Sequence, residues 1–114
     1  MNRWVEIRSY NLKPGTRGEF DRLVREVSLP MLKRWGVDVV AFGPSPHDET
    51  SYYLIRAYDS LAQRQSSQDA FYGSAEWRQG PREEIVSLIE THTSIVIEME
   101  LAAVGGLRKA GERG

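Results

Sequence analysis

Two arginines occupy matching places in two short segments of the sequence. Residues 5–10 read VEIRSY and residues 53–58 read YLIRAY, so Ile, Arg and Tyr recur at the same spacing 48 positions apart. A guanidinium offers several N–H donors to oxygen atoms, and a tyrosine two positions further along a strand lies on the same face. The pairs Arg8–Tyr10 and Arg56–Tyr58 are therefore candidate residues for a site that binds a small anionic or carbonyl-bearing ligand.

The elements that must position these residues alternate between strands and helices. Period-two alternation predicts strands at residues 4–10, 37–42, 52–58 and 93–101. A helical pattern follows Thr16, which forms a capping box with Glu19, and it ends at Gly36. A second helical region begins at Asp59 or Ser60 and restarts at residue 81. The order is βαββαβ, which is the ferredoxin-like α+β arrangement.

Right-handed crossovers then fix the order of the four strands in the sheet. The strand at residues 52–58 lies between the first and second strands, and the first strand lies between the third and fourth. The folded domain covers residues 1–101, and the Gly-rich charged segment 102–114 is expected to be a flexible tail.

The alternation divides the sheet residues into an apolar face and a mixed face. We expect the apolar face to pack against the helices; it comprises Val5, Ile7, Tyr53, Ile55, Ala57, Ile95, Ile97 and Met99. The mixed face comprises Trp4, Glu6, Arg8, Tyr10, Tyr52, Leu54, Arg56, Tyr58, Val96, Glu98 and Glu100. No predicted element is left to cover this mixed face, and a second copy of the chain is its simplest cover. We therefore expect a homodimer in which the two sheets pair face to face as an α/β barrel.

Charge complementarity sets the expected strand register. Arg56 should lie opposite Glu6, and Arg8 should lie near Glu98, since like charges on opposed strands repel. These residues then either form structural ion pairs within the interface or bind a ligand in a cavity lined also by Tyr10, Tyr52 and Tyr58. The sequence leaves both readings open.

One histidine adds a candidate for acid–base chemistry. His92 precedes the fourth strand on the same parity as Ser94, where an imidazole has a suitable free pKa for proton transfer near neutral pH. With Arg56 and Tyr58 it forms the set of candidate catalytic residues. A structural histidine at the start of a strand is the alternative.

Composition excludes several classes of function. The chain has 114 residues, no cysteine and a net charge of −1, which excludes disulfides and gives no electrostatic signature for nucleic acid or anionic membranes. No long apolar run or signal peptide is present, so a cytoplasmic protein is expected. Haem, flavin and metal signatures are missing, and we expect neither a cofactor nor a metal.

Three segments resemble the NIPSNAP family of the dimeric α/β-barrel superfamily. They are VEIRSYNLKPGTRGEF, LPMLKRWGVDVVAF and YLIRAYDSLAQRQ with the following AEW, and the likeness spans residues 4–100. The resemblance implies a ferredoxin-like subunit that pairs through its sheet. It supplies no catalytic motif, because related barrels include cofactor-independent monooxygenases and isomerases.

Three functions fit these observations. The first is a homodimer that binds a small organic molecule in the sheet-lined cavity. The second is a cofactor-independent monooxygenase or isomerase that uses the same cavity. The third is a protein–protein interaction module whose dimer interface is filled by side chains.

Overall fold

The structure is a computed structural model that describes residues 1–112. Four strands and a series of helices follow one another along the chain. In order they are β1 (Asn2–Leu12), α1 (Arg17–Leu23), the π-helix η1 (Val24–Ser28), α2 (Leu29–Arg34), β2 (Asp38–Pro44), β3 (Ser51–Tyr58), α3 (Leu61–Gly73), α4 (Ala75–Gln79), α5 (Arg82–Val86), β4 (Ile89–Glu100) and α6 (Leu101–Glu112).

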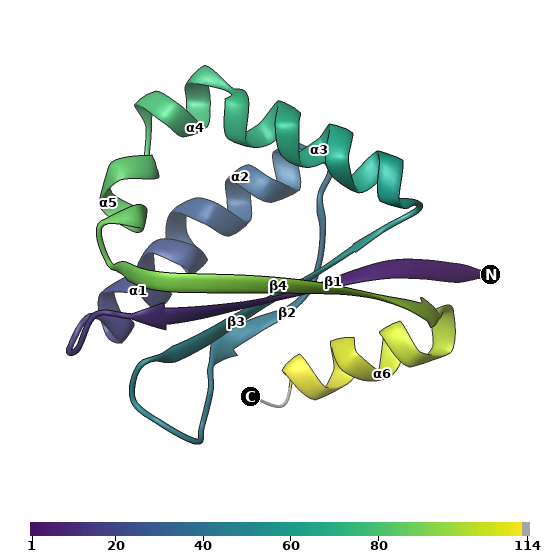
Figure 1. Ribbon diagram of the computed structural model, residues 1–114, viewed down its shortest axis with the longest axis horizontal. Coiled ribbons are helices and arrows are strands. Elements are labelled where there is room, and N and C mark those ends of the chain that lie inside the picture. Colours follow the sequence, from purple (N-terminus) through teal and green to yellow (C-terminus); the bar gives the residue numbers. More distant parts are fainter. Residues whose placement is uncertain (113–114) are drawn as a thin grey trace.

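The four strands form one antiparallel sheet in the order β2-β3-β1-β4. This order confirms the predicted topology, with β1 and β3 as the central pair. Helices α1 to α5 lie on one face of the sheet, and α6 lies on the other (Figure 1). The molecule therefore has three layers, one more than a bare ferredoxin-like subunit.

Local signals in the sequence account for several helix ends. The backbone N–H of Gly36 donates to Lys33, that of Val37 donates to Leu32, and Gly36 has a φ of 75°. This is a Schellman motif, and it confirms the predicted stop at Gly36. Ser60 caps α3 by accepting from the backbone N–H of Gln63, also as predicted.

The predicted capping box at the start of α1 is wrong. The Thr16 hydroxyl donates to the carbonyl oxygen of Lys13 at 2.7 Å, so it makes no side-chain cap with the helix. The long helix that follows is divided by the π-turn η1 just before Pro30. Pro30 accounts for a break in this helix, because proline supplies no N–H for the preceding turn.

Each face of the sheet has its own hydrophobic core. The larger core lies beneath α1 to α5 and is built around Leu12, Phe20, Leu23, Val24, Met31, Leu32, Tyr52, Phe71, Trp77 and Ile85. The smaller core lies between the sheet and α6 and is built around Val5, Val40, Ala41, Ile55, Ala57 and Val104.

The predicted assignment of the two sheet faces is therefore reversed. The mixed face with Glu6 and Arg56 packs against the layer of helices α1 to α5, and the apolar face with Val5 and Ile55 packs partly against α6. Alternation separated the residues correctly, but it does not state which set meets the helices. Helix α3 is itself polar, and its side chains satisfy the charged groups of the mixed face.

The segment predicted as a flexible tail forms a helix instead. Residues 101–112 are helical, Val104 is buried, and Leu107 packs against the same core. Gly105 and Gly106 weaken the local helical preference, and burial of Val104 compensates for this cost. Residues 113 and 114 of the predicted tail lie outside the described residues. Among residues 1–112, no helix is long and apolar enough to span a bilayer.

Candidate functional site

A buried ion pair joins the two central strands. The register places Glu6 directly opposite Arg56, as predicted, and the two side chains are 0% and 1% exposed. Arg56 donates from Nε at 2.9 Å and from Nη2 at 2.5 Å, both to Oε1 of Glu6. A pair removed this far from water is retained only when its remaining donors and acceptors are also satisfied.

Helix α3 supplies the remaining partners of this carboxylate. Arg64 donates to Oε2 of Glu6 from Nε at 2.9 Å and from Nη2 at 2.5 Å, and Gln68 donates to the same oxygen at 2.7 Å. Arg8 adds a longer contact, with Nη2 3.7 Å from Oε2. One carboxylate therefore faces three guanidiniums beneath α3.

This arrangement lowers the pKa of Glu6 strongly. Burial alone would raise the pKa, but Arg56, the hydrogen bond from Gln68 and Arg8 together outweigh it and lower the pKa of Glu6 to about 2. The carboxylate is therefore ionised throughout the physiological pH range.

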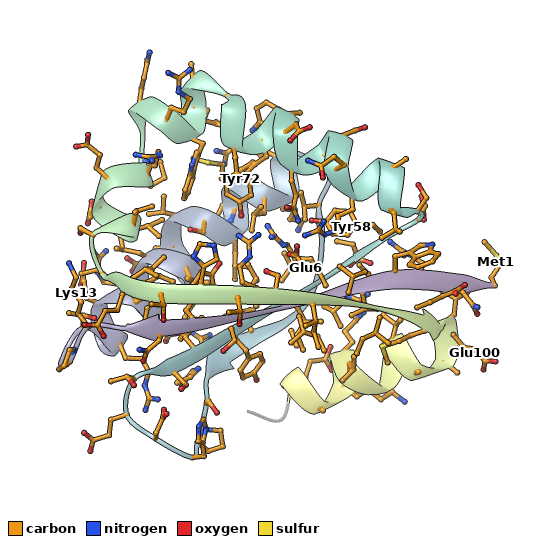
Figure 2. All side chains as sticks on the ribbon, viewed as in Figure 1. Met1, Glu6, Lys13, Tyr58, Tyr72 and Glu100 are labelled. Atoms are coloured by element: carbon orange, nitrogen blue, oxygen red, sulfur yellow. The ribbon has the colours of Figure 1, made fainter. Side chains whose placement is uncertain are left out.

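Tyr72 connects the buried ion pair to the molecular surface. Its hydroxyl oxygen accepts a hydrogen bond from Nη1 of Arg56 at 2.8 Å and another from Nη1 of Arg8 at 3.1 Å. Figure 2 shows Glu6, Tyr58 and Tyr72 together in the space between the sheet and α3. Whereas Arg56 is fully buried, the side chain of Arg8 is 14% exposed and reaches an open pocket.

That pocket, which we name the Arg8 pocket, lies between the β1–β4 edge of the sheet and helices α4 and α5. Its volume is about 300 Å³. It combines two arginines, two tyrosines and a histidine with an apolar wall. The lining residues are Arg8, Tyr10, Tyr72, Trp77, Arg82, Ile85, Val86, Ile89 and His92. A few convergent polar groups on an apolar wall are typical of a small-molecule site.

A smaller apolar cavity lies behind the Arg8 pocket. It measures about 40 Å³ and shares Tyr10, Tyr72, Trp77 and Ile85 with the pocket. The same four side chains thus form both the inner wall of the pocket and one side of the cavity.

The larger hollow beside β2 and α6 is a weaker candidate. It measures about 550 Å³ and contains Arg25 and Arg108. Both of these arginines already have carboxylate partners, since Arg25 pairs with Asp21 at 2.9 Å and Arg108 with Asp38 at 3.1 Å. Little positive charge remains there for a ligand.

Three of the predicted site residues come together in the Arg8 pocket. Arg8 and Tyr10 line it from β1, and His92 lines it from β4. The rings of Tyr10 and His92 face one another across the two strands, with centroids 6.2 Å apart. Burial raises the pKa of Tyr10 to about 12, so this phenol is neutral near pH 7.

The other predicted site residues lie elsewhere. Arg56, Glu6 and Tyr58 are buried beneath α3; Arg56 is linked to the pocket through Tyr72, and Glu6 through Arg8. Tyr52 is in the main core, where its hydroxyl donates to Asp21 at 2.6 Å.

The predicted proximity of Arg8 and Glu98 is wrong. Arg8 lies opposite Ser94 and donates to its hydroxyl at 3.1 Å, whereas Glu98 lies opposite Trp4 and accepts from Asn2 at 3.1 Å. The β1–β4 register thus differs from the one that charge pairing suggested. The carboxylate that lies near Arg8 is that of Glu6, on the same strand, and not that of Glu98.

Sequence reasoning missed four residues of this region. They are Arg64, Gln68, Tyr72 and Arg82. The first three recur every four positions along α3 and so form one polar stripe toward the sheet, a signal that was present in the sequence. Nothing local distinguishes Arg82 from the other exposed arginines. Among the described residues, no group of three or more His, Asp and Glu side chains is arranged to hold a metal.

The sequence profile of the NIPSNAP family matches residues 5–100. The chain belongs to the NIPSNAP family. Solved structures of family members share its fold. A NIPSNAP family protein from Agrobacterium tumefaciens is 19% identical with a TM-score of 0.77, and the match covers 87% of each chain. A second NIPSNAP protein from that organism, of unknown function, is 22% identical with a TM-score of 0.77, over 84% of this chain and 86% of the other.

The fold also extends beyond the NIPSNAP family. A putative antibiotic biosynthesis monooxygenase from Bordetella bronchiseptica is 18% identical with a TM-score of 0.64, over 88% of this chain and 97% of the other. At this identity the likeness concerns the fold alone. No functionally curated protein matches the NIPSNAP chain.

Proposed function

We propose that this NIPSNAP protein binds a small organic molecule in the Arg8 pocket. The observation that carries the proposal is the convergence of Arg8, Arg82, Tyr72 and His92 on one otherwise apolar hollow. A volume of about 300 Å³ is at the lower end of the range for ligand sites, which favours a compact ligand.

Native mass spectrometry of the freshly purified protein tests this proposal first. We expect a co-purified molecule that is lost from Val86→Trp, because Val86 lines the pocket and is 42% exposed, so that an indole there fills the hollow without entering the core. Val86→Ala, which enlarges the pocket, is the matched control and should retain the ligand. Equal occupancy in Val86→Trp and wild type would contradict the assignment to this pocket.

A homodimer completes the proposal. Ile95 and Ile97 are 59% and 43% exposed on the face of β4 that α6 leaves open, and β4 is a sheet edge. Long exposed edges with apolar side chains are usually covered by a partner. A second copy of the chain on this face buries both isoleucines.

A proton-transferring enzyme is the second candidate. His92 and the Tyr72 hydroxyl line the same pocket, and the fold is shared with putative antibiotic biosynthesis monooxygenases. Of the candidate catalytic residues, His92 alone lines the pocket, so Arg56 and Tyr58 have structural roles in this scheme. A screen of phenolic and enolisable carbonyl substrates with His92→Ala as the comparison tests it, and identical turnover in both proteins would remove His92 from catalysis. A dimer that binds no small molecule would favour the interaction module instead.

A further inference from the structure

We infer that the ligand of the Arg8 pocket is an organic carboxylate with a compact apolar body. The inference rests on the proposed function and adds the chemical class of the ligand. It is carried by the charge balance of the network behind the pocket, the donors that this network leaves unused, and the apolar character of the rest of the pocket lining.

The network behind the pocket carries more positive than negative charge. Arg8, Arg56 and Arg64 all contact Glu6, and among the described residues no other carboxylate lies within 4.0 Å of these guanidiniums. Three positive charges therefore share one negative charge. Because Arg56 is fully buried and Arg8 is 14% exposed, solvent compensates this excess incompletely. An anion beside Arg8 would balance it.

Arg8 is held in place while part of its guanidinium stays unused. Nε donates to Ser94, Nη1 donates to Tyr72, and Nη2 approaches Glu6. A guanidinium has five N–H donors, and the hydrogen bonds to Ser94 and Tyr72 use two of them, which leaves N–H groups on both Nη1 and Nη2 for a ligand. A fixed pair of such donors suits a carboxylate better than a flexible lysine would, because less side-chain entropy is lost on binding.

The hydroxyl of Tyr72 contributes another donor. Its oxygen accepts from Arg8 and Arg56, and no described residue accepts the hydroxyl hydrogen. Guanidiniums only donate, so this hydrogen must find an acceptor elsewhere. Tyr72 lines the pocket, and a carboxylate oxygen there would accept from Tyr72 and Arg8 together.

The rest of the pocket selects the body of the ligand. Arg82 lines the pocket from α5 and makes no ion pair within 4.0 Å among the described residues, which adds a positive charge. The remaining wall is formed by Tyr10, Trp77, Ile85, Val86 and Ile89. Aromatic and branched aliphatic side chains favour an apolar ring or short chain over a sugar or a polyanion.

Matched pairs of acid and amide test this inference by calorimetry on the full chain. The probes are benzoate with benzamide, phenylacetate with phenylacetamide, and hexanoate with hexanamide. We expect every acid that binds to do so at least tenfold more tightly than its matched amide, since the amide keeps the shape of the acid and loses its charge. Arg82→Met should weaken the acid several-fold and leave the amide unchanged. Arg78→Met, an exposed arginine of α4 outside the pocket, should change neither.

Arg8→Met should abolish the preference for acid over amide. Arg82→Met keeps the test valid if Arg8→Met fails to fold, because Arg82 is outside the buried network. Equal affinity for acids and amides, both lost in Val86→Trp, would overturn the carboxylate and leave the pocket as a ligand site. Absence of binding by every acid at millimolar concentration would also overturn the inference, and native mass spectrometry then decides the proposed function separately.

Discussion

Arg56 donates two hydrogen bonds to a single oxygen of Glu6, and neither side chain reaches solvent. Since the other Glu6 oxygen is taken by Arg64 and Gln68 on α3, this carboxylate joins the two central strands to the helix above them. Removing it leaves a buried guanidinium without its partner. The stability of the NIPSNAP fold should therefore depend strongly on Glu6.

Glu6→Gln should lower the free energy of unfolding by about 3–5 kcal/mol, the usual cost of breaking a buried ion pair on one side. Urea denaturation followed by circular dichroism measures this loss. Glu98→Gln on β4 is the control, since Glu98 is exposed and its loss should change stability by less than about 0.5 kcal/mol. Equal, small effects in the two variants would contradict the proposed role of Glu6.

Acid should destabilise the wild type through the same carboxylate. The pKa of Glu6 is lower in the folded state, about 2, than its ordinary value of 4.5 in the unfolded chain. Its contribution is complete above about pH 4.5 and is lost as the pH falls through about 2, because the unfolded chain binds the proton first. A shift of this size is worth about 3 kcal/mol. The difference in unfolding free energy between wild type and Glu6→Gln should therefore shrink between pH 5 and pH 2. A constant difference over this range would refute the lowered pKa of Glu6.

Tyr72→Phe keeps the aromatic ring and removes the acceptor shared by Arg8 and Arg56. We expect a loss of about 1–3 kcal/mol, because a buried guanidinium donor is left unsatisfied. Tyr53→Phe is the control, since the Tyr53 hydroxyl makes no hydrogen bond to another described residue. Thermal unfolding of both variants checks this prediction, and a Tyr72→Phe variant no less stable than Tyr53→Phe would show that the hydroxyl of Tyr72 has no structural role.

Two glycines of α6 should respond to alanine in opposite ways. A Cβ atom added at Gly111 would lie 2.7 Å from the Cβ of Ala41, whereas one added at Gly106 meets nothing within 4 Å. Gly106→Ala should raise stability by up to about 1 kcal/mol through helix propensity. Gly111→Ala should lower stability or displace the end of α6 from β2. Denaturation midpoints decide the signs, and stabilisation by both substitutions would show that α6 does not pack closely on Ala41.

The proposed dimer depends on the open apolar strip of β4. Ile95→Lys and Ile97→Lys each place a charge on this strip and should shift sedimentation at micromolar concentration from dimer to monomer. Glu98→Lys puts the same side chain on the opposite face of the strand and should leave the dimer intact. A wild-type monomer at that concentration, or dimers in both isoleucine variants, would rule out this surface.

The sequence was sufficient for the strand order, because right-handed crossovers constrain a βαββαβ chain. It was also sufficient for the Glu6–Arg56 pairing, because opposite charges favour that register. It was insufficient for the orientation of the sheet. Period-two alternation creates two faces without marking which one meets the helices, and the polar stripe Arg64, Gln68 and Tyr72 on α3 was the signal that decides it. We expected the apolar face to meet the helices between the strands, but the charged side chains of Glu6 and Arg56 meet α3 instead.

Helix α6 was not predicted for a different physical reason. Its glycines lower local helix propensity, and tertiary contacts stabilise it: Val104 and Leu107 pack on the smaller core, and Arg108 pairs with Asp38. For the site, Arg8, Tyr10 and His92 were found because two strands place them side by side. Arg82 joins them only through the path of the chain after α4, which no local pattern encodes.

The position of β1 between β3 and β4 has a consequence for synthesis of the chain. Its two edges pair with residues 51–58 and 89–100. Most backbone donors and acceptors of the first strand therefore stay unpaired until these later segments have been translated. Glu6 likewise meets Arg56, Arg64 and Gln68 only once residues up to 68 have left the ribosome. Such non-local closure slows folding and leaves unpaired strand edges exposed meanwhile. The nascent chain should therefore remain accessible to chaperones until β4 emerges and closes the sheet.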